Sequence, residues 1–225
     1  MLEFLSSPFL GIVLCIFTYE IGLYLKKKWP NPILNPLLVA IVLCIIILKL
    51  GHIPLTSFQA GGDIINLFLV PITAILAVPI YRQMEVIRQG WLPILLGALV
   101  GSLVSIVSVF LLCQAFHVDT SLMISLLPKS VTTPIAIEVS GSLGGLVPVT
   151  LGAVMVTGIF GAVVAPQLIR WFHIKNPIAA GLGIGTSCHA VGTSKALEIG
   201  EVEGAMSGIA IGVAGLITVL ISLFL

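Results

Sequence analysis

The sequence predicts an all-α integral membrane protein with about six membrane-spanning helices and two re-entrant hairpins that form an inverted repeat. Hydrophobic residues make up 58% of the 225 residues and charged residues only 8%, whereas soluble domains carry roughly 25% charged residues. Apolar stretches of membrane-spanning length follow one another along the chain. The polar, proline-containing stretch 127–134 interrupts them, as in transporters whose broken helices form the binding site.

Four apolar stretches precede that interruption, over residues 8–25, 33–50, 64–80 and 91–116. Lys26, Lys27 and Lys28 follow the first of them, and the positive-inside rule places them in the cytoplasm and the N-terminus outside. Asn35 stands before Pro36 as a helix cap, although its amide could instead face a site. We expect residues 51–62 to form a polar outer loop and residues 81–89 to lie in the cytoplasm.

The second half of the chain repeats itself at an offset of 60 residues. Residues 121–160 match residues 181–220 without gaps, with identities that include Thr133/Thr193, Glu138/Glu198 and Gly144/Gly204. Each copy places an interrupted polar segment, 117–145 or 176–204, before an apolar span, 146–169 or 205–225. We interpret this pattern as a degenerate duplication.

Two topologies fit the interrupted segments. If both cross the membrane as broken helices, the chain has eight crossings and the basic loop 170–175 lies outside, against the charge rule. If both are re-entrant hairpins, that loop is cytoplasmic and the two units are inverted. Arms of roughly ten residues would reach about 15 Å, half of a hydrocarbon core of about 30 Å. The sequence favours hairpins and leaves the eight crossings as the alternative.

These patterns suggest a functional division of the chain. We expect residues 1–116 to be scaffold and oligomerisation helices, and residues 117–225 to be a duplicated transport core. Its two halves are 117–170 and 176–225, each a hairpin followed by a helix. Because so few scaffold helices shield two hairpins from lipid, we expect a homo-oligomer, a dimer or larger, embedded in the lipid bilayer.

The hairpin tips carry the candidate site residues. An isolated lysine at membrane depth is costly and faces protein or a water-filled cavity, and helices that begin at the tips direct N–H groups toward the site. Both features favour a small organic anion such as a carboxylate. The candidate substrate-binding residues of the two tips are Lys129, Ser130, Thr132, Thr133, Gly185, Thr186, Ser187, His189, Gly192 and Thr193.

Proton coupling is a further expectation for this site. His189 is equivalent to Lys129 in the repeat, and an unperturbed histidine titrates near neutral pH; Glu138 is the second candidate. Each has an alternative: His189 as a buried, hydrogen-bonded imidazole, Glu138 as a carboxylate at a hairpin base, and the tip hydroxyls as interhelical packing. We expect no enzyme activity, cofactor, metal site or nucleic-acid partner. The cysteines, without metal-ligand spacing, should be free thiols; they are Cys15, Cys44, Cys113 and Cys188.

Four segments together resemble the LrgB/CidB family over essentially the whole chain. They are residues 35–40 (NPLLVA), 127–136 (LPKSVTTPIA), 141–145 (GSLGG) and 185–193 (GTSCHAVGT). The resemblance implies an antiholin-like or holin-like protein of the bacterial cytoplasmic membrane. It would act with a small LrgA/CidA-type membrane partner on murein hydrolase activity, autolysis and programmed cell death. The family also includes bacterial pyruvate uptake systems and is similar to the C-terminal half of the plant plastidial glycolate/glycerate translocator.

The sequence therefore leaves two functions. The first is a secondary transporter or facilitator of a small monocarboxylate, such as pyruvate, glycolate, glycerate or lactate, with autolysis affected downstream. The alternative is an antiholin-like or holin-like regulator of murein hydrolases. A lesion-forming holin has no need of a lysine-bearing hairpin in duplicated form, so the site chemistry favours the transporter.

Overall fold

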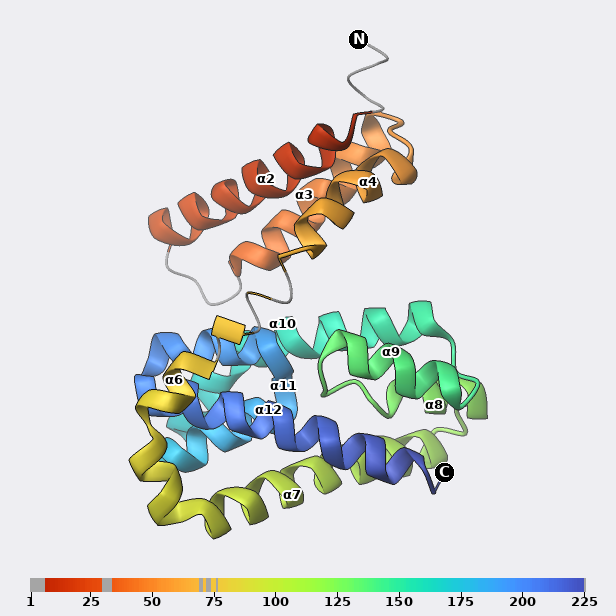
Figure 1. Ribbon diagram of the computed structural model, residues 1–225. Coiled ribbons are helices and arrows are strands. Elements are labelled where there is room, and N and C mark those ends of the chain that lie inside the picture. Colours follow the sequence, from red (N-terminus) through yellow and green to blue (C-terminus); the bar gives the residue numbers. More distant parts are fainter. Residues whose placement is uncertain (1–6, 30–33, 69–70, 72–73, 76, 225) are drawn as a thin grey trace. The chain divides into compact units, whose positions relative to one another are not determined.

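The computed structural model describes residues 7–29, 34–68, 71, 74–75 and 77–224 (Figure 1). The chain divides into two compact units, Met1–Ile75 and Leu76–Leu225, and each is described by itself. All regular secondary structure in the described residues is α-helical. The predicted all-α class is confirmed.

The first unit contains α2 (Pro8–Lys28), α3 (Pro36–Leu50) and α4 (Leu55–Asn66). Pro36 begins α3, and Asn35 Oδ1 accepts from Leu37 N at 2.9 Å, so Asn35 is the expected helix cap. Both α3 and α4 pack against α2. A Cβ on Gly22 would lie only 2.6 Å from the Pro36 carbonyl oxygen, so glycine is what permits this close approach of α2 and α3.

Helix α4 corrects the expectation of a polar loop over residues 51–62. Gly11 of α2 and Gly61 of α4 face each other so closely that a Cβ on Gly11 would stand 3.0 Å from the Gly61 Cα. This contact brings two helix backbones together, and the packing stabilises a helix whose other face is polar.

The predicted span over residues 64–80, which the sequence interrupts at Pro71 and Pro79, is not one continuous helix. Helix α4 ends at Asn66, Leu67 and Phe68 form a turn, and α6 covers Ala77–Arg82. Residues 69, 70, 72, 73 and 76 of that prediction lie outside the described residues.

The second unit is built around the long helix α7 (Met84–Ala115). Gly90 breaks the helical backbone with φ −122° and ψ 26°. The polar part of α7, with Glu85 and Arg88, precedes this kink, and the apolar part begins at Trp91, where the sequence predicts the span to begin. After α7 come α8 (Thr120–Leu126), α9 (Thr133–Ser142), α10 (Val147–Trp171), α11 (Pro177–Ile199) and α12 (Glu201–Ser222).

The first interrupted segment folds back on itself. Ser125 Oγ of α8 accepts a hydrogen bond from Leu146 N at 2.6 Å. Ser140 of α9 lies against Gly145, the residue before Leu146. Residues on both arms therefore meet the adjacent residues Gly145 and Leu146. Helices α8 and α9 are the arms of a hairpin whose tip is 127–132 (Figure 1).

The second interrupted segment also folds back, at His189, where φ is 44° and ψ is −145°. Gly185 packs against the backbone of Ser207 in α12, and Thr193 Oγ1 lies 2.7 Å from Ser207 Oγ. In a straight helix Gly185 and Thr193 would be about 12 Å apart along the axis. Because both reach one residue of α12, the two halves of α11 form a tight hairpin.

The two hairpins start from opposite ends of the second unit. Arg82, just before α7, pairs with Glu201 at the start of α12, so the second hairpin and α12 begin at the N-terminal end of α7. Leu127 packs with Val109 and Cys113 near the other end of α7. Helices α10 and α12 consequently run in opposite directions (Figure 1). This is the inverted arrangement that the repeat and the charge rule favour.

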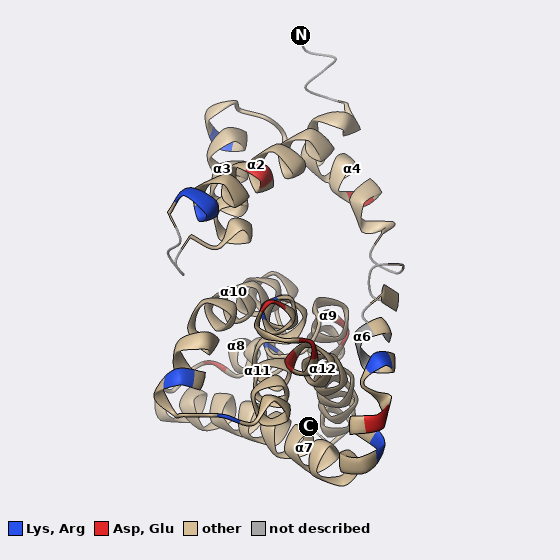
Figure 2. Cartoon of the chain, turned by 90° about the vertical axis from the view of Figure 1, so that its left-hand side faces the viewer, with Lys and Arg blue, Asp and Glu red and all other residues tan. Residues whose placement is uncertain are grey.

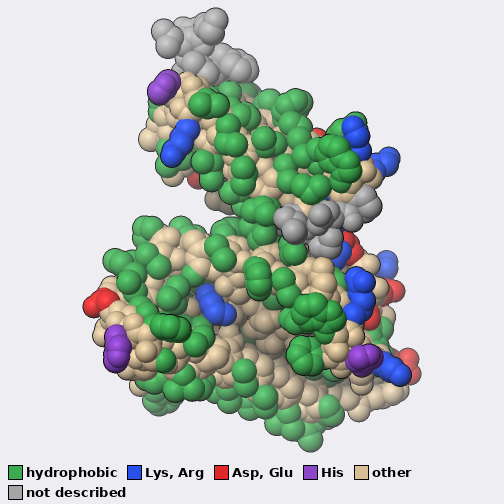
Figure 3. Space-filling view, turned by 180° about the vertical axis from the view of Figure 1, so that it is seen from behind, with side chains coloured by type: hydrophobic (Ala, Val, Ile, Leu, Met, Phe, Trp, Pro, Cys, Tyr) green, Lys and Arg blue, Asp and Glu red, His purple; other side chains and the backbone are tan. Residues whose placement is uncertain are grey.

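The helices have the character of a multi-pass membrane protein. Among the described helices, α2, α7, α10 and α12 are long and apolar enough to cross a membrane, and α3 is apolar but shorter. Hydrophobic side chains cover much of the second unit in Figure 3, while its charged and histidine side chains gather toward its ends, apart from one basic side chain nearer the middle.

The compact units do not coincide with the expected functional division at residue 116. Helix α7 packs against α11 and α12 and belongs to the second unit. The assignment of residues 1–116 to scaffold and of residues 117–225 to transport stays a prediction.

Candidate functional site

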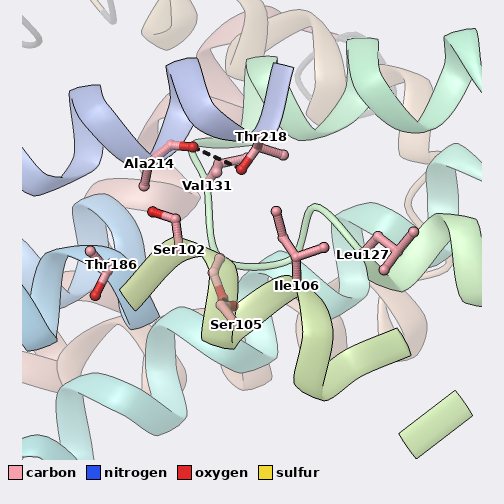
Figure 4. A pocket seen from close by; sticks show the side chains of 9 residues that line it. Ser102, Ser105, Ile106, Leu127, Val131, Thr186, Ala214 and Thr218 are labelled. Atoms are coloured by element: carbon pink, nitrogen blue, oxygen red, sulfur yellow. Dashed lines mark hydrogen bonds between the residues drawn. The ribbon is translucent and has the colours of Figure 1, made fainter. Parts of the chain in front are cut away.

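The two hairpin tips approach each other beside α7 and α12. A small pocket lies where they meet, with about 190 Å³ of open volume including its mouth. Residues of the first tip, of the first arm of α11 and of both long helices line it (Figure 4). The space that it leaves for a guest molecule, about 10 Å³, holds about one water molecule. The pocket is lined by Ser102, Ser105, Ile106, Leu127, Ser130, Val131, Thr186, Ala214 and Thr218.

Lys129 sits at the first tip, half-buried, with its ammonium directed to a neighbouring hydroxyl. Lys129 Nζ donates to Ser130 Oγ at 3.0 Å, and Ser105 Oγ of α7 donates to the same oxygen at 2.7 Å. Ser130 is 5% exposed. Since its oxygen accepts two hydrogen bonds, its own proton remains to be donated.

His189 occupies the equivalent place at the second tip and is buried. Its Nε2 lies 2.9 Å from the Val154 carbonyl oxygen of α10, which fixes Nε2 as the protonated nitrogen of a neutral ring because a carbonyl only accepts. A Cβ on Gly158 would lie 2.6 Å from the ring, so this glycine makes room for the imidazole. Lys129 is within electrostatic range of His189 and of Cys188. The two repeat-related residues thus stand at the tips of the two hairpins.

The remaining hydroxyls of the second hairpin have different surroundings. Thr186 is buried beside Gly101 of α7 and lines the pocket. Thr193 is buried and joins the second arm to α12 through Ser207. Ser187 is exposed, donates to Gly183 O at 2.6 Å and lies 3.0 Å from Cys188 Sγ.

The glycines of this hairpin serve close packing. Gly185 touches Ser207 and Ala210 of α12, and Gly192 touches Cys188 and Ile184 of the first arm. Both are buried among protein atoms. Their approach to a ligand, which the sequence suggests, stays a prediction.

Three further predicted residues lie around the first hairpin. Thr132 precedes α9 as its N-terminal cap residue without a side-chain cap bond, and Thr133 begins the helix; both are half-buried. Glu138 is exposed on α9, away from the residues that line the pocket. The proton-coupling role of Glu138 finds no contact to support it here, whereas His189 lies at the meeting point of the tips.

The sequence did not indicate that side chains of α7 and α12 line the pocket. Ser102, Ser105 and Thr218 line the pocket, and Ser207 binds Thr193. Hydroxyls three residues apart in an otherwise apolar helix were the available signal in α7, but such residues often serve packing only. In the described part of the chain no group of three or more His, Cys, Asp and Glu residues could hold a metal ion.

Comparison with known proteins agrees with the motifs of both tips. The model of the LrgB-like family matches residues 15–225. The antiholin-like protein LrgB of Bacillus subtilis is 38% identical over 221 residues, covering 98% of this chain and 96% of that protein. The antiholin-like protein LrgB of Bacillus cereus strain B4264 is 38% identical over 216 residues, covering 96% and 94%. No solved structure matches the chain. On the family match and on these full-length relatives, the chain belongs to the LrgB-like family.

Proposed function

We propose that this chain is an antiholin-like protein of the bacterial cytoplasmic membrane whose molecular activity is transport of a small monocarboxylate. The two halves of the proposal have different support. The names of the relatives favour the regulatory half directly. The transport half rests on the hairpin site and goes beyond those names.

Lys129 is the observation that carries the transport half. Among the described residues no carboxylate lies within 4.0 Å of its ammonium, and its hydrogen-bond partner is the neutral Ser130. A cation held by protein at membrane depth calls for a negative partner. Lys129 has two further N–H protons, and Ser130 has its own, so three donors are available at one tip for a carboxylate.

The inverted hairpins support a transport cycle. The two hairpins start from opposite ends of the second unit, and their polar tips meet near its middle. Small movements of one repeat against the other can expose such tips alternately to either side of the membrane. The pocket beside the tips has room for about one water molecule, so a pyruvate-sized anion requires the tips to separate. The conformation described here, before that separation, therefore corresponds to a closed state of the cycle.

Transport is tested with the purified protein in proteoliposomes. Uptake of labelled pyruvate, glycolate, lactate and glycerate should saturate, and the uptake of lactate and glycerate should differ between stereoisomers. A lesion-forming protein would instead release solutes according to size. Leakage of glucose and other neutral solutes at the same rate as these anions would contradict the transport half.

Regulation of murein hydrolases is the second part, and the relatives' names support it. A deletion strain should show altered autolysis, and the wild-type gene should restore it, with or without a small LrgA/CidA-type partner gene. If autolysis is a consequence of anion flux, a transport-deficient variant that is still inserted in the membrane should fail to restore it. Full restoration by such a variant would separate regulation from transport.

A further inference from the structure

We infer that the hydroxyl-lined pocket is a binding site for a sodium ion. Its polar atoms other than Ser130 come from Ser102 and Ser105 of α7, Thr186 of α11 and Thr218 of α12 (Figure 4). Four hydroxyl-bearing side chains from three helices thus line one small space. Oxygen ligands of this kind suit hard cations.

The hydrogen bonds of these hydroxyls determine what the pocket presents. A hydroxyl has one proton and two lone pairs, and each of the four protons is already used. One is donated to Ser130, as described above, and the others to the carbonyl four residues earlier in the same helix: Ser102 Oγ to Ala98 O at 2.7 Å, Thr186 Oγ1 to Leu182 O at 2.8 Å, and Thr218 Oγ1 to Ala214 O at 2.7 Å.

Apart from Ser130, whose proton is not used, the hydroxyls of the pocket therefore offer lone pairs to whatever it holds. Hydroxyls of membrane helices commonly bond to their own backbone in this way, and singly such a bond indicates nothing about ligands. Here the convergence is the informative feature, because four such hydroxyls line one pocket, together with Ser130 and the apolar side chains of Ile106, Leu127, Val131 and Ala214. An anion would be repelled by these lone pairs, so the carboxylate belongs at Lys129 and a cation in the pocket.

The size of the space selects the cation. The free space of about 10 Å³ holds a single water molecule, which suits a dehydrated sodium ion and leaves no room for a larger organic cation. Side-chain oxygens replace the hydration shell, as the oxygens of ion-selective sites do in channels. Potassium, being larger, would have to push apart helices that are already in contact.

The charges around the pocket make binding depend on the anion. Lys129 is bonded to Ser130, which lines the pocket, and no carboxylate is among the lining residues. At an assumed separation of about 6 Å and an effective dielectric constant of about 20, a positive charge would weaken cation binding by on the order of a hundredfold. A carboxylate bound at Lys129 would offset that charge and restore the affinity. This mutual dependence of cation and anion binding would give coupled uptake of sodium and monocarboxylate, an inference that rests on the proposed transport function.

The sodium site is tested first without transport. The melting temperature of the purified full chain in detergent is measured in sodium, potassium and choline chloride at one ionic strength, with and without pyruvate. We expect sodium to raise it, and to do so more strongly with pyruvate present. Ser102→Ala and Thr218→Val should lose most of the sodium-specific increase. Thr18→Val is the matched control, because Thr18 is buried in α2 and donates to Leu14 O at 2.6 Å but does not line the pocket.

Each result decides between the sodium site and its alternatives. Equal melting temperatures in the three salts, for a protein that pyruvate still stabilises, would show that the pocket holds only water. An equal loss of the sodium effect in Thr18→Val would show a general effect on folding. Uptake in proteoliposomes that is unchanged when choline replaces sodium would remove the coupling while leaving the proposed transport intact.

Discussion

Arg82 Nη1 lies 3.7 Å from Glu201 Oε1, joining the segment that precedes α7 to the start of α12. Both side chains are exposed, so the pair contributes little to stability. Its importance is topological, because it places the beginnings of two long apolar helices at one end of the second unit. Charged residues of α6, of the first turns of α7 and of the start of α12 gather at that end (Figure 2).

The first prediction concerns the orientation of that end. By the positive-inside rule, this end of the second unit is predicted to lie in the cytoplasm, because it carries Arg82, Arg88, Arg170 and Lys175. Both termini are predicted to lie outside. A cysteine at Lys175, in a background without the native cysteines, should resist an impermeant thiol reagent added to intact cells. A cysteine at Gln114, exposed near the opposite end of α7, is the control and should react. Reaction of both positions from outside would require a different topology.

The second prediction is that Lys129→Met abolishes most anion binding while the protein stays folded. A charge-assisted hydrogen bond contributes about 1.5–3 kcal/mol, so binding should weaken by roughly ten- to a hundredfold or more. Methionine keeps most of the stem, and no carboxylate near Lys129 would be left unpaired. Lys129→Arg should also fail because the planar guanidinium needs more width than an ammonium. Uptake and melting temperature are measured on the same preparations; normal uptake by Lys129→Met would refute the anion site.

The third prediction concerns His189→Gln. The glutamine amide can donate to the Val154 carbonyl in place of Nε2, so the second hairpin should keep its shape and binding at a fixed pH should be retained. If the imidazole carries the coupled proton, uptake in the variant should lose its dependence on pH between about 5.5 and 8. The check is uptake by wild type and variant across that range, with the membrane potential clamped. Identical pH profiles would assign His189 a structural role only.

The fourth prediction tests the second hairpin by its packing. A Cβ on Gly185 would collide with the Ser207 carbonyl oxygen in α12, whereas a Cβ on Gly183, in the same arm, meets no atom within 4 Å. Gly185→Ala should therefore destabilise the protein by about 1–3 kcal/mol, and Gly183→Ala should leave stability unchanged or slightly raised. Thermal unfolding in detergent compares the two. Equal effects would mean that the first arm of α11 does not lie on α12 as described.

The fifth prediction is that the protein forms a homodimer or a larger homo-oligomer. Large hydrophobic side chains are exposed along α2 and α7, among them Phe17 at 61%, Val104 at 61% and Leu111 at 59%, and lipid or a second copy can cover them. Mass measurement in mild detergent should give a multiple of the 23.7 kDa chain. A monomer that binds pyruvate with wild-type affinity would contradict this prediction.

Local chemistry was sufficient to predict the first interruption. Pro128 and Pro134 remove backbone donors from a helix within one short stretch, and the structure has a non-helical tip between α8 and α9. The cap at Asn35 follows equally from its own side chain and from the proline after it. These features depend on a few neighbouring residues, so the sequence by itself determines them.

The contacts between distant residues were decided by tertiary structure. Residues 51–62 look like a loop because they are polar and contain two adjacent glycines, yet Gly61 packs against Gly11 and the segment is helical. Whether a glycine ends a helix or permits a close contact depends on what lies opposite it. That partner is distant in the chain, so the local sequence could not distinguish the two outcomes.

The same reason explains how the candidate site could be foreseen in part. Lysine, histidine and hydroxyls in interrupted apolar segments predict a polar site at the two tips, and Ser130 and Thr186 of the two hairpins do line one pocket. The sequence alone could not predict that Ser105 of α7 donates to Ser130, or that Thr218 of α12 faces the same pocket, because a hydroxyl in an apolar helix is compatible with any neighbour. The sequence determined the interruptions and their chemistry, and the folding of both segments back against α7 and α12 decided which residues meet there.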